Sequence, residues 1–156
     1  LIGKACYAFR TNKGRRYLVL IHEYEYKVFV IKFHDARYKN SALRFNMMTG
    51  EFDCGRVLRT VIEIAALTLR NEPLASFAFV GVYKIGKETK DTENSQRHRI
   101  YMKLAENFLG GQTFIHSYEN KSNCYLLVNK ANENPTDLHG TIVEMFAQTY
   151  QELSHL

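Results

Sequence analysis

The chain has 156 residues, with ten tyrosines, ten phenylalanines, only two prolines and no low-complexity run. This length and composition favour a single globular domain over residues 1–156 and argue against a disordered chain. No apolar run approaches the length of a membrane span, and the first residues lack the layout of a signal peptide. We therefore expect no membrane among the partners of this chain.

The formal net charge is +5. Such an excess suits an anionic partner, either a nucleotide-bearing cofactor or a nucleic acid, and it equally suits an ordinary soluble surface. The chain has three cysteines, an odd number, and they are far apart in the sequence: Cys6, Cys54 and Cys124. This favours reduced thiols and a cytoplasmic location. The three cysteines also lack the paired spacing of a zinc site. The six histidines are dispersed as well, so the sequence predicts no metal site.

The first third of the chain is rich in short β-type segments. Alternation and turn signals predict strands at residues 4–10, 15–22, 26–34 and 42–47. The first two are separated by Thr11-Asn12-Lys13-Gly14, where glycine stands at a position that tolerates positive φ. The link at 23–25 is not turn-like, so the second and third segments are either one bent strand or a hairpin with an unusual tip. Both interpretations give an antiparallel meander.

The strongest helix pattern spans residues 53–71. Its apolar residues recur at steps of three and four, so most of the circumference of this helix must be buried against other parts of the protein. Asp53 is placed to cap the first turn, and Asn71 and Pro73 end the helix because the residue before a proline avoids helical angles. A narrow polar side remains, formed by Arg56, Arg59, Glu63 and Arg70.

The remainder of the chain alternates strands and helices. Residues 74–83 are an almost unbroken apolar run, typical of a strand buried on both faces. Residues 94–109 have helical periodicity and stop at Gly110-Gly111. Two further strands, at 113–118 and 125–130, form a hairpin, and Asn134-Pro135 opens a last helix.

This order predicts an α+β (mixed α/β) fold in which helices pack on a curved, mostly antiparallel sheet. The last helix follows the final strand of that sheet.

The segment at residues 94–105 reads N-S-Q-R-H-R-I-Y-M-K-L-A. It resembles the signature N-x-x-A-x-x-L-Y-x-K-L-G-F of the GNAT N-acyltransferase superfamily, with Asn94, Tyr101, Lys103 and Leu104 on matching positions. The resemblance covers about residues 46–130 and implies a GNAT-like fold with an extra C-terminal helix. It also implies that Tyr101 is the general acid that protonates the leaving thiolate of coenzyme A, which suits a phenol that is protonated at neutral pH. Packing of Tyr101 on the apolar side of its helix explains the same residue without catalysis.

The family binds the cofactor pyrophosphate at a [QR]-x-x-G-x-[GA] motif that opens the central helix. Residues 52–57 of this chain keep only the middle glycine, Gly55, so the motif is degenerate. Asp53 adds a negative charge there, which Arg56 and Arg59 offset. The resemblance thus implies acetyl-CoA or another acyl-CoA as cofactor, contacted by Gly55, Arg56 and Asn94, and an amine of a small molecule or a protein as acceptor. It further implies that parallel strands near 74–83 and 113–118 splay apart beside the central helix.

Two other functions fit the sequence. One is a non-enzymatic module that binds a protein or nucleic acid on the same fold. Its phosphate contacts would come from Lys84, Lys87, Lys90, Arg97 and Arg99. The other is self-association, for example as a homodimer, through the edge of the aromatic-rich meander.

Overall fold

The computed structural model describes residues 2–11, 13–38, 54–80, 103, 105–110, 112–119 and 124–154. Its strands are β1 (Gly3–Arg10), β2 (Arg16–Tyr24), β3 (Val28–Asp35), β4 (Ser76–Val80), β5 (Phe114–Glu119) and β6 (Cys124–Asn129). Its helices are α1 (Cys54–Asn71) and α3 (Pro135–Ser154), and its short helical turns are η1 (Glu25–Lys27), η2 (Ala36–Tyr38) and the π-helical η3 (Glu106–Gly110). The strand predicted at 42–47 and residues 94–102 of the predicted second helix lie outside the described residues.

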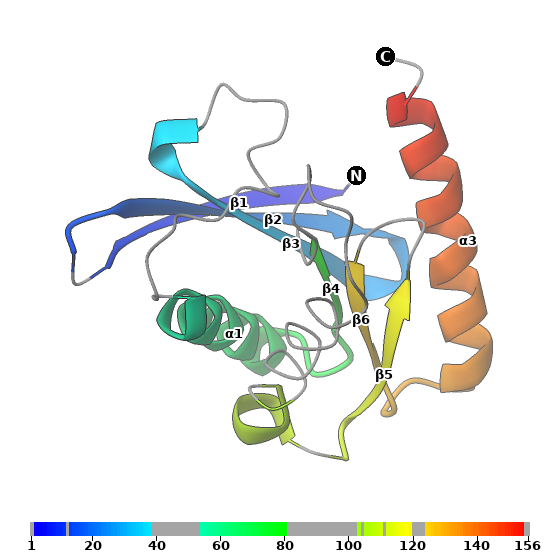
Figure 1. The fold of residues 1–156 in the computed structure, drawn as a ribbon. Coiled ribbons are helices and arrows are strands. Elements are labelled where there is room, and N and C mark those ends of the chain that lie inside the picture. Colours follow the sequence, from blue (N-terminus) through cyan, green and yellow to red (C-terminus); the bar gives the residue numbers. More distant parts are fainter. Residues whose placement is uncertain are drawn as a thin grey trace.

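The described strands form one six-stranded sheet in the order β1-β2-β3-β4-β6-β5 (Figure 1). β3 and β4 pair in parallel, whereas the other four ladders are antiparallel. The predicted α+β class, with helices on a mostly antiparallel sheet, is therefore confirmed. The curvature of the sheet and its likeness to the GNAT family stay predictions.

Both hairpins of the meander depend on positive backbone angles. In the β1–β2 turn, Gly14 has a φ of 76°, and its N–H donates to the carbonyl of Thr11 over 2.9 Å. The glycine at this turn therefore plays the role that the sequence predicts. The β2–β3 connection has a less common tip, because Tyr26 and Lys27 have φ values of 63° and 57°. The segments at 15–22 and 26–34 are thus two antiparallel strands and not one bent strand.

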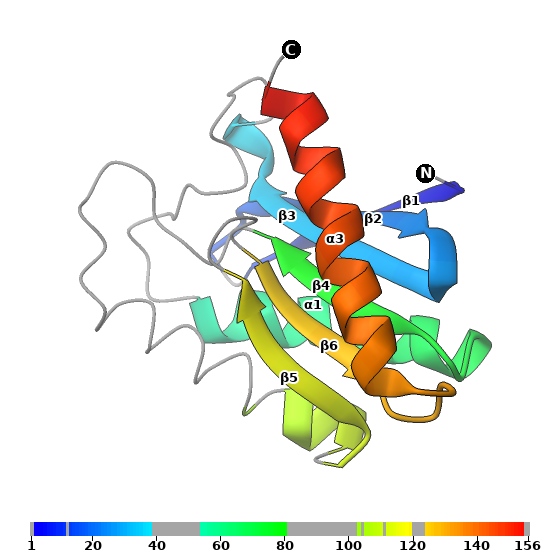
Figure 2. The same cartoon turned by 90° about the vertical axis from the view of Figure 1, so that its right-hand side faces the viewer.

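Helices α1 and α3 lie on opposite faces of the sheet (Figures 1 and 2). Successive side chains of a strand point to opposite faces of the sheet, so each strand can contact both helices. In β4, Phe77 and Phe79 belong to the cluster under α1, whereas the intervening Ala78 belongs to the cluster under α3. In β6, Leu127 packs toward α1 in the same way and Leu126 toward α3. β4 and β6 are therefore buried on both faces, as the apolar run at 74–83 predicts for β4.

Helix α1 buries the apolar stripe that its sequence predicts. The buried residues of this stripe are Val57, Leu58, Val61, Ile62, Ile64 and Ala65. The predicted polar side is exposed at all four of its charged residues. Burial of this stripe contributes on the order of 10 kcal/mol of gross transfer free energy, most of which the lost chain entropy offsets. The helix ends at Asn71, as predicted.

Candidate functional site

The connection from β3 through α1 to β4 is the feature that defines the candidate site. β4 runs parallel to β3 in register from Val28↔Ser76 to Ile31↔Phe79, and α1 lies between the two strands in the chain. In such a unit the helix begins near the carboxyl ends of the parallel strands, where its first backbone N–H groups are available to a ligand. Among the described residues this ladder ends at Ile31↔Phe79, whereas β3 continues to Asp35.

The expectation that strands near 74–83 and 113–118 are parallel neighbours is wrong. β5 runs in the same direction as β4, but β6 lies between them and pairs antiparallel with both. The physical reason is that β5 and β6 form a hairpin, and the returning strand of the hairpin takes the place beside β4. The parallel neighbour of β4 is β3.

Three chain segments meet at this end of the sheet. The β1–β2 turn and the amino end of α1 are brought together, because Arg10 and Thr11 line the same pocket as Arg56 and Val57. The carboxyl end of β3 joins them through the pairing of Asp35 with Tyr17, close after the turn. Figure 1 shows the hairpin turn and the start of α1 on the same side of the molecule.

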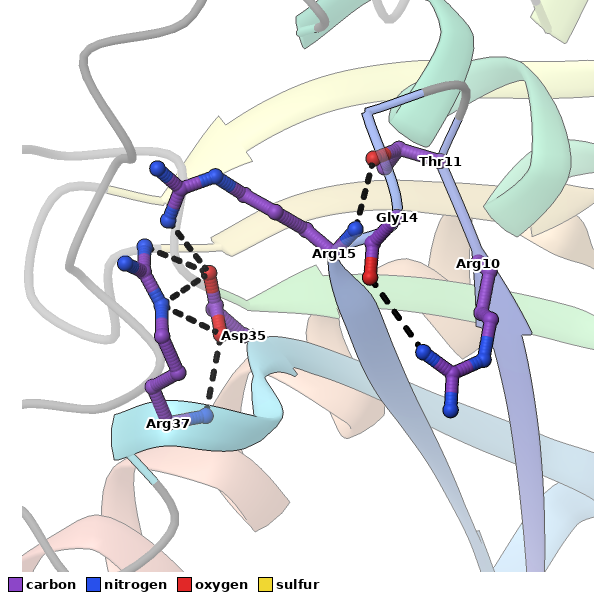
Figure 3. A network of polar contacts seen from close by, with 6 residues as sticks. All are labelled: Arg10, Thr11, Gly14, Arg15, Asp35 and Arg37. Carbon is purple, nitrogen blue, oxygen red and sulfur yellow. Dashed lines mark hydrogen bonds and ion pairs between the residues drawn. The ribbon is translucent and has the colours of Figure 1, made fainter.

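Asp35 is the centre of a polar cluster with Arg37 and Arg15 (Figure 3). Its carboxylate is 1% exposed and accepts from the backbone N–H of Arg37 over 2.9 Å. The Arg37 guanidinium donates through Nε over 3.2 and 3.1 Å and through Nη2 over 2.9 Å. Arg15 adds a second cation, with Nη1 at 3.6 Å from Oδ2. The cluster balances a buried charge and fixes the turn after β3.

A pocket of about 350 Å³ lies between the β1–β2 hairpin and the first half of α1. Phe9 and Val57 supply its apolar wall, and the Phe9 ring is held by a stacked contact with Tyr17 at a centroid distance of 5.6 Å. The polar lining consists of Arg10 and Thr11 from the hairpin, and of Arg56, Arg59, Thr60 and Glu63 from the helix. A pocket of this size accommodates a small ligand.

The charges of this pocket are mostly positive. Its three arginines and one glutamate give the lining a formal charge of +2, that is, three minus one. Nε of Arg59 is 3.3 Å from Oε1 of Glu63, in an ion pair whose side chains are 61% and 51% exposed. Arg56 is exposed and forms no ion pair with a described residue. The arrangement can therefore attract and orient an anion.

The structure places only part of the predicted site. Gly55 is the second residue of α1, and Arg56 follows it on the pocket side. Tyr101 and Asn94 lie outside the described residues, as do the proposed phosphate contacts Lys84, Lys87, Lys90, Arg97 and Arg99. The structure thus places Arg56 and Arg59 beside the same pocket. It does not test the other predicted site residues.

Sequence reasoning missed Arg10, Phe9 and the Asp35 cluster. The available signal was the segment F-R-T-N-K-G-R-R, which places Phe9 and Arg10 beside a predicted turn. That signal indicates a hairpin, but it does not reveal which helix the hairpin contacts.

Two side-chain pairs connect β5 to its neighbours. His116 shares a hydrogen bond with the hydroxyl of Tyr125, and Ser117 Oγ lies 2.8 Å from Nε2 of His139 on α3. Burial raises the pKa of Tyr125 far above its usual value, and the charge of Glu106 adds to this shift. These pairs tie β5 to β6 and to α3.

Within the part of the chain that the structure describes, no three His, Cys, Asp or Glu side chains come together in a way that would hold a metal ion. In the same residues, neither helix has the length and apolarity needed to cross a membrane. Comparison of the chain with protein-family models, with curated proteins and with solved structures finds no match.

Proposed function

We propose that this chain is a GNAT-like N-acyltransferase domain that binds acyl-CoA at the amino end of α1. One observation carries the proposal: among the strands that the structure describes, one pair, β3 and β4, is parallel and is connected through α1, while the other ladders are antiparallel. The order that follows it, a buried strand, a helical turn and a β-hairpin, also supports the resemblance at residues 94–105.

The first turn of α1 supplies groups that suit a pyrophosphate. The backbone N–H groups of a helix's first turn and the positive end of the helix dipole favour a phosphate there. Gly55 carries no side chain that would block a close approach, and Arg56 offers an exposed guanidinium. Asn94 belongs to the proposed cofactor contacts through the resemblance alone.

The proposed reaction transfers an acyl group to an amine. The amine nitrogen attacks the thioester carbonyl, the carbon–sulfur bond breaks, and the coenzyme A thiolate leaves. Tyr101 donates its phenolic proton to that thiolate, while the amine loses a proton to solvent. In this role Tyr101 affects the chemical step more than it affects cofactor binding.

Thermal unfolding with acetyl-CoA tests the binding step. At ten times the dissociation constant, the ligand stabilises the folded state by about 1.4 kcal/mol. For a chain of this size the midpoint should rise by roughly 3–6 °C. Arg56→Gln should reduce the rise, whereas Arg70→Gln, an exposed arginine in the last turn of the same helix, should leave it unchanged.

Turnover of an amine acceptor tests the chemistry. Tyr101→Phe should lower the rate of thiol release and leave the acetyl-CoA shift intact. A flat thermal response at millimolar acetyl-CoA would contradict the proposal. If an oligonucleotide then bound with a steep salt dependence, the non-enzymatic module would be the better explanation.

A further inference from the structure

Strand β1 is an edge of the sheet, and its side chains are accessible on both faces. Among the described strands it has a neighbour on one side only, β2 (Figure 2), and residues 4–8 are all exposed. Its register with β2 is continuous from Gly3 to Arg10, and the segment contains no proline. An extended edge of this kind is a template on which a further strand can pair.

The hydrogen bonding of the β1–β2 turn shows which backbone groups of β1 face away from β2. The N–H of Thr11 donates to the carbonyl of Arg15 over 2.8 Å, so these two residues form a hydrogen-bonded pair that continues the register of the ladder. Such pairs alternate along an antiparallel ladder, which turns the backbone groups of the odd-numbered residues of β1 toward β2. The even-numbered residues therefore direct their N–H and C=O groups outward: Lys4, Cys6, Ala8 and Arg10.

One row of β1 side chains is apolar and lies on the α1 side of the sheet. Tyr7 is opposite Val19, which belongs to the core cluster under α1, and Ala5 is two residues away on the same face. The side chain of Tyr7 is nevertheless 42% exposed. An apolar or β-branched side chain of an added strand would cover it, because aromatic and β-branched residues on neighbouring strands form stabilising pairs.

The other row of β1 side chains is basic at both ends. Lys4 is directly opposite His22, and Arg10 is directly opposite Arg16. The pKa of His22 is lowered by burial and then by the charges of Lys32 and Lys4, so both lysines lie near this ring. Within strands β1, β2 and β3, no residue on this face is acidic. Like charges on directly opposite residues destabilise a sheet, and carboxylates from a partner would offset that repulsion.

The charges of β1 also indicate which kind of chain is the better partner. In two antiparallel copies of β1, the outward groups meet only when even-numbered residues are opposite even-numbered residues. The register that pairs residues 4–10 of both copies then places Lys4 of each copy opposite Arg10 of the other. A second copy would therefore add cations to the basic row, whereas an acidic segment would neutralise it.

We propose that the outer edge of β1 binds an extended segment of another protein, in which acidic and apolar residues alternate, as an additional strand of the sheet. The acidic side chains lie beside Lys4 and Arg10, and the apolar side chains cover Tyr7. The proposal goes beyond the acyltransferase function and does not rest on it, since it needs neither the cofactor nor the residues at the amino end of α1.

Titration with three heptapeptides tests the charge pattern. The peptide acetyl-EVTVTVE-amide has an apolar row and an acidic residue at each end, acetyl-KVTVTVK-amide has basic ends, and acetyl-EEEEEEE-amide lacks the apolar row. The first should bind saturably and the other two much more weakly. Lys4→Glu should weaken binding of the first peptide roughly threefold to tenfold, because a repulsion replaces an exposed attraction, and it should strengthen binding of the second. Lys130→Glu, at an exposed lysine directly after β6, is the matched control and should change neither.

Amide hydrogen exchange, measured residue by residue by NMR, tests the strand pairing itself. Saturation with acetyl-EVTVTVE-amide should slow exchange at Cys6 and Ala8, whose N–H groups face outward. Exchange at Ala5 and Tyr7 should change less, since their N–H groups face β2. A peptide held by charge alone would not produce this alternation.

Several results would overturn the proposal. They are the absence of saturable binding of acetyl-EVTVTVE-amide, equally tight binding of acetyl-EEEEEEE-amide, equal effects of Lys4→Glu and Lys130→Glu, and equal protection of odd- and even-numbered amides in β1. Lys4 and Lys130 are both exposed, so these variants should fold as the parent does. A free chain that sediments as a dimer and is dissociated by the first peptide would assign the edge to a second copy, and this too would overturn the proposal.

Discussion

Substitution of Asp35 by alanine probes the polar cluster that fixes the end of β3. The carboxylate is 1% exposed and accepts from the backbone N–H, Nε and Nη2 of Arg37. Hydrogen bonds to charged groups contribute about 1.5–3 kcal/mol each to stability when they are buried. Arg37 is 52% exposed, however, and regains water when its partner is removed. We therefore expect Asp35→Ala to lower the free energy of unfolding by about 2–3 kcal/mol in total.

A double-mutant cycle separates this pairing from the other effects of the substitution. Arg37→Ala leaves Asp35 with the backbone N–H of residue 37 and with Arg15 at 3.6 Å, so it should cost only about 1–2 kcal/mol. The double variant should be about as stable as Asp35→Ala alone, because the contacts between Arg37 and Asp35 are already lost there. Arg16→Ala, at an exposed position, should change stability by less than about 0.5 kcal/mol.

Equilibrium unfolding in urea, with equal slopes for all variants, gives these differences directly. The reasoning is refuted if Asp35→Ala costs less than about 0.5 kcal/mol, or if the effects of the two single substitutions simply add. Either result would mean that the contacts between Asp35 and Arg37 contribute little to the stability of the fold.

Two further predictions concern the core and the pH dependence of stability. Ile62→Ala, at a side chain with 0% exposure, should lower the free energy of unfolding in urea by about 3–4 kcal/mol. Leu67→Ala, at a side chain that is 48% exposed on the same helix, should lower it by less than about 1 kcal/mol. Equal losses would contradict the placement of α1. Burial, and then the charges of Lys32 and Lys4, lower the pKa of His22 from 6.5, so the unfolded state binds a proton more readily than the folded state does. Stability should therefore fall as the pH falls below 6.5 toward the lower pKa of the folded state. His22→Gln should reduce this loss between pH 7 and pH 5, and an unchanged pH slope would count against the shifted pKa.

The sequence predicted the elements whose patterns are local. Helix α1 is recognisable because apolar residues at steps of three and four can be covered only as a helix packed on the sheet, and its end at Asn71 follows from Pro73. Strand β4 is recognisable as a continuous apolar run, since both of its faces are buried. The sequence did not decide between one bent strand and a hairpin at η1, because Tyr26 and Lys27 are not residue types that usually adopt positive φ.

Strand neighbours and polar contacts could not be predicted in the same way, since they depend on residues that are distant in the chain. The place of β6 between β4 and β5 is decided by hairpin closure and by burial of Leu126 and Leu127, not by a motif. The fully buried Asn129 illustrates the same limit. Its side-chain amide donates to the carbonyls of Pro73 over 2.8 Å and Ala75 over 3.0 Å, more than fifty residues away.

The position of the candidate site follows from topology, and this bears on the proposed acyl-CoA site, where residues 52–57 keep only Gly55 of the motif that the resemblance implies. A parallel connection needs a crossover, and the crossover helix α1 begins where β3 ends, next to the β1–β2 turn. The positive end of the helix dipole is present whatever the first residues are, and Arg56 and Arg59 add formal charges beside it. On the proposal that α1 binds acyl-CoA, the residues at 52–57 that depart from the GNAT motif change how closely a phosphate can approach the backbone, but they leave the attraction for anions. A chain with this arrangement should select its anion through guanidinium groups more than through backbone N–H groups, which is why the arginine variants are the decisive ones.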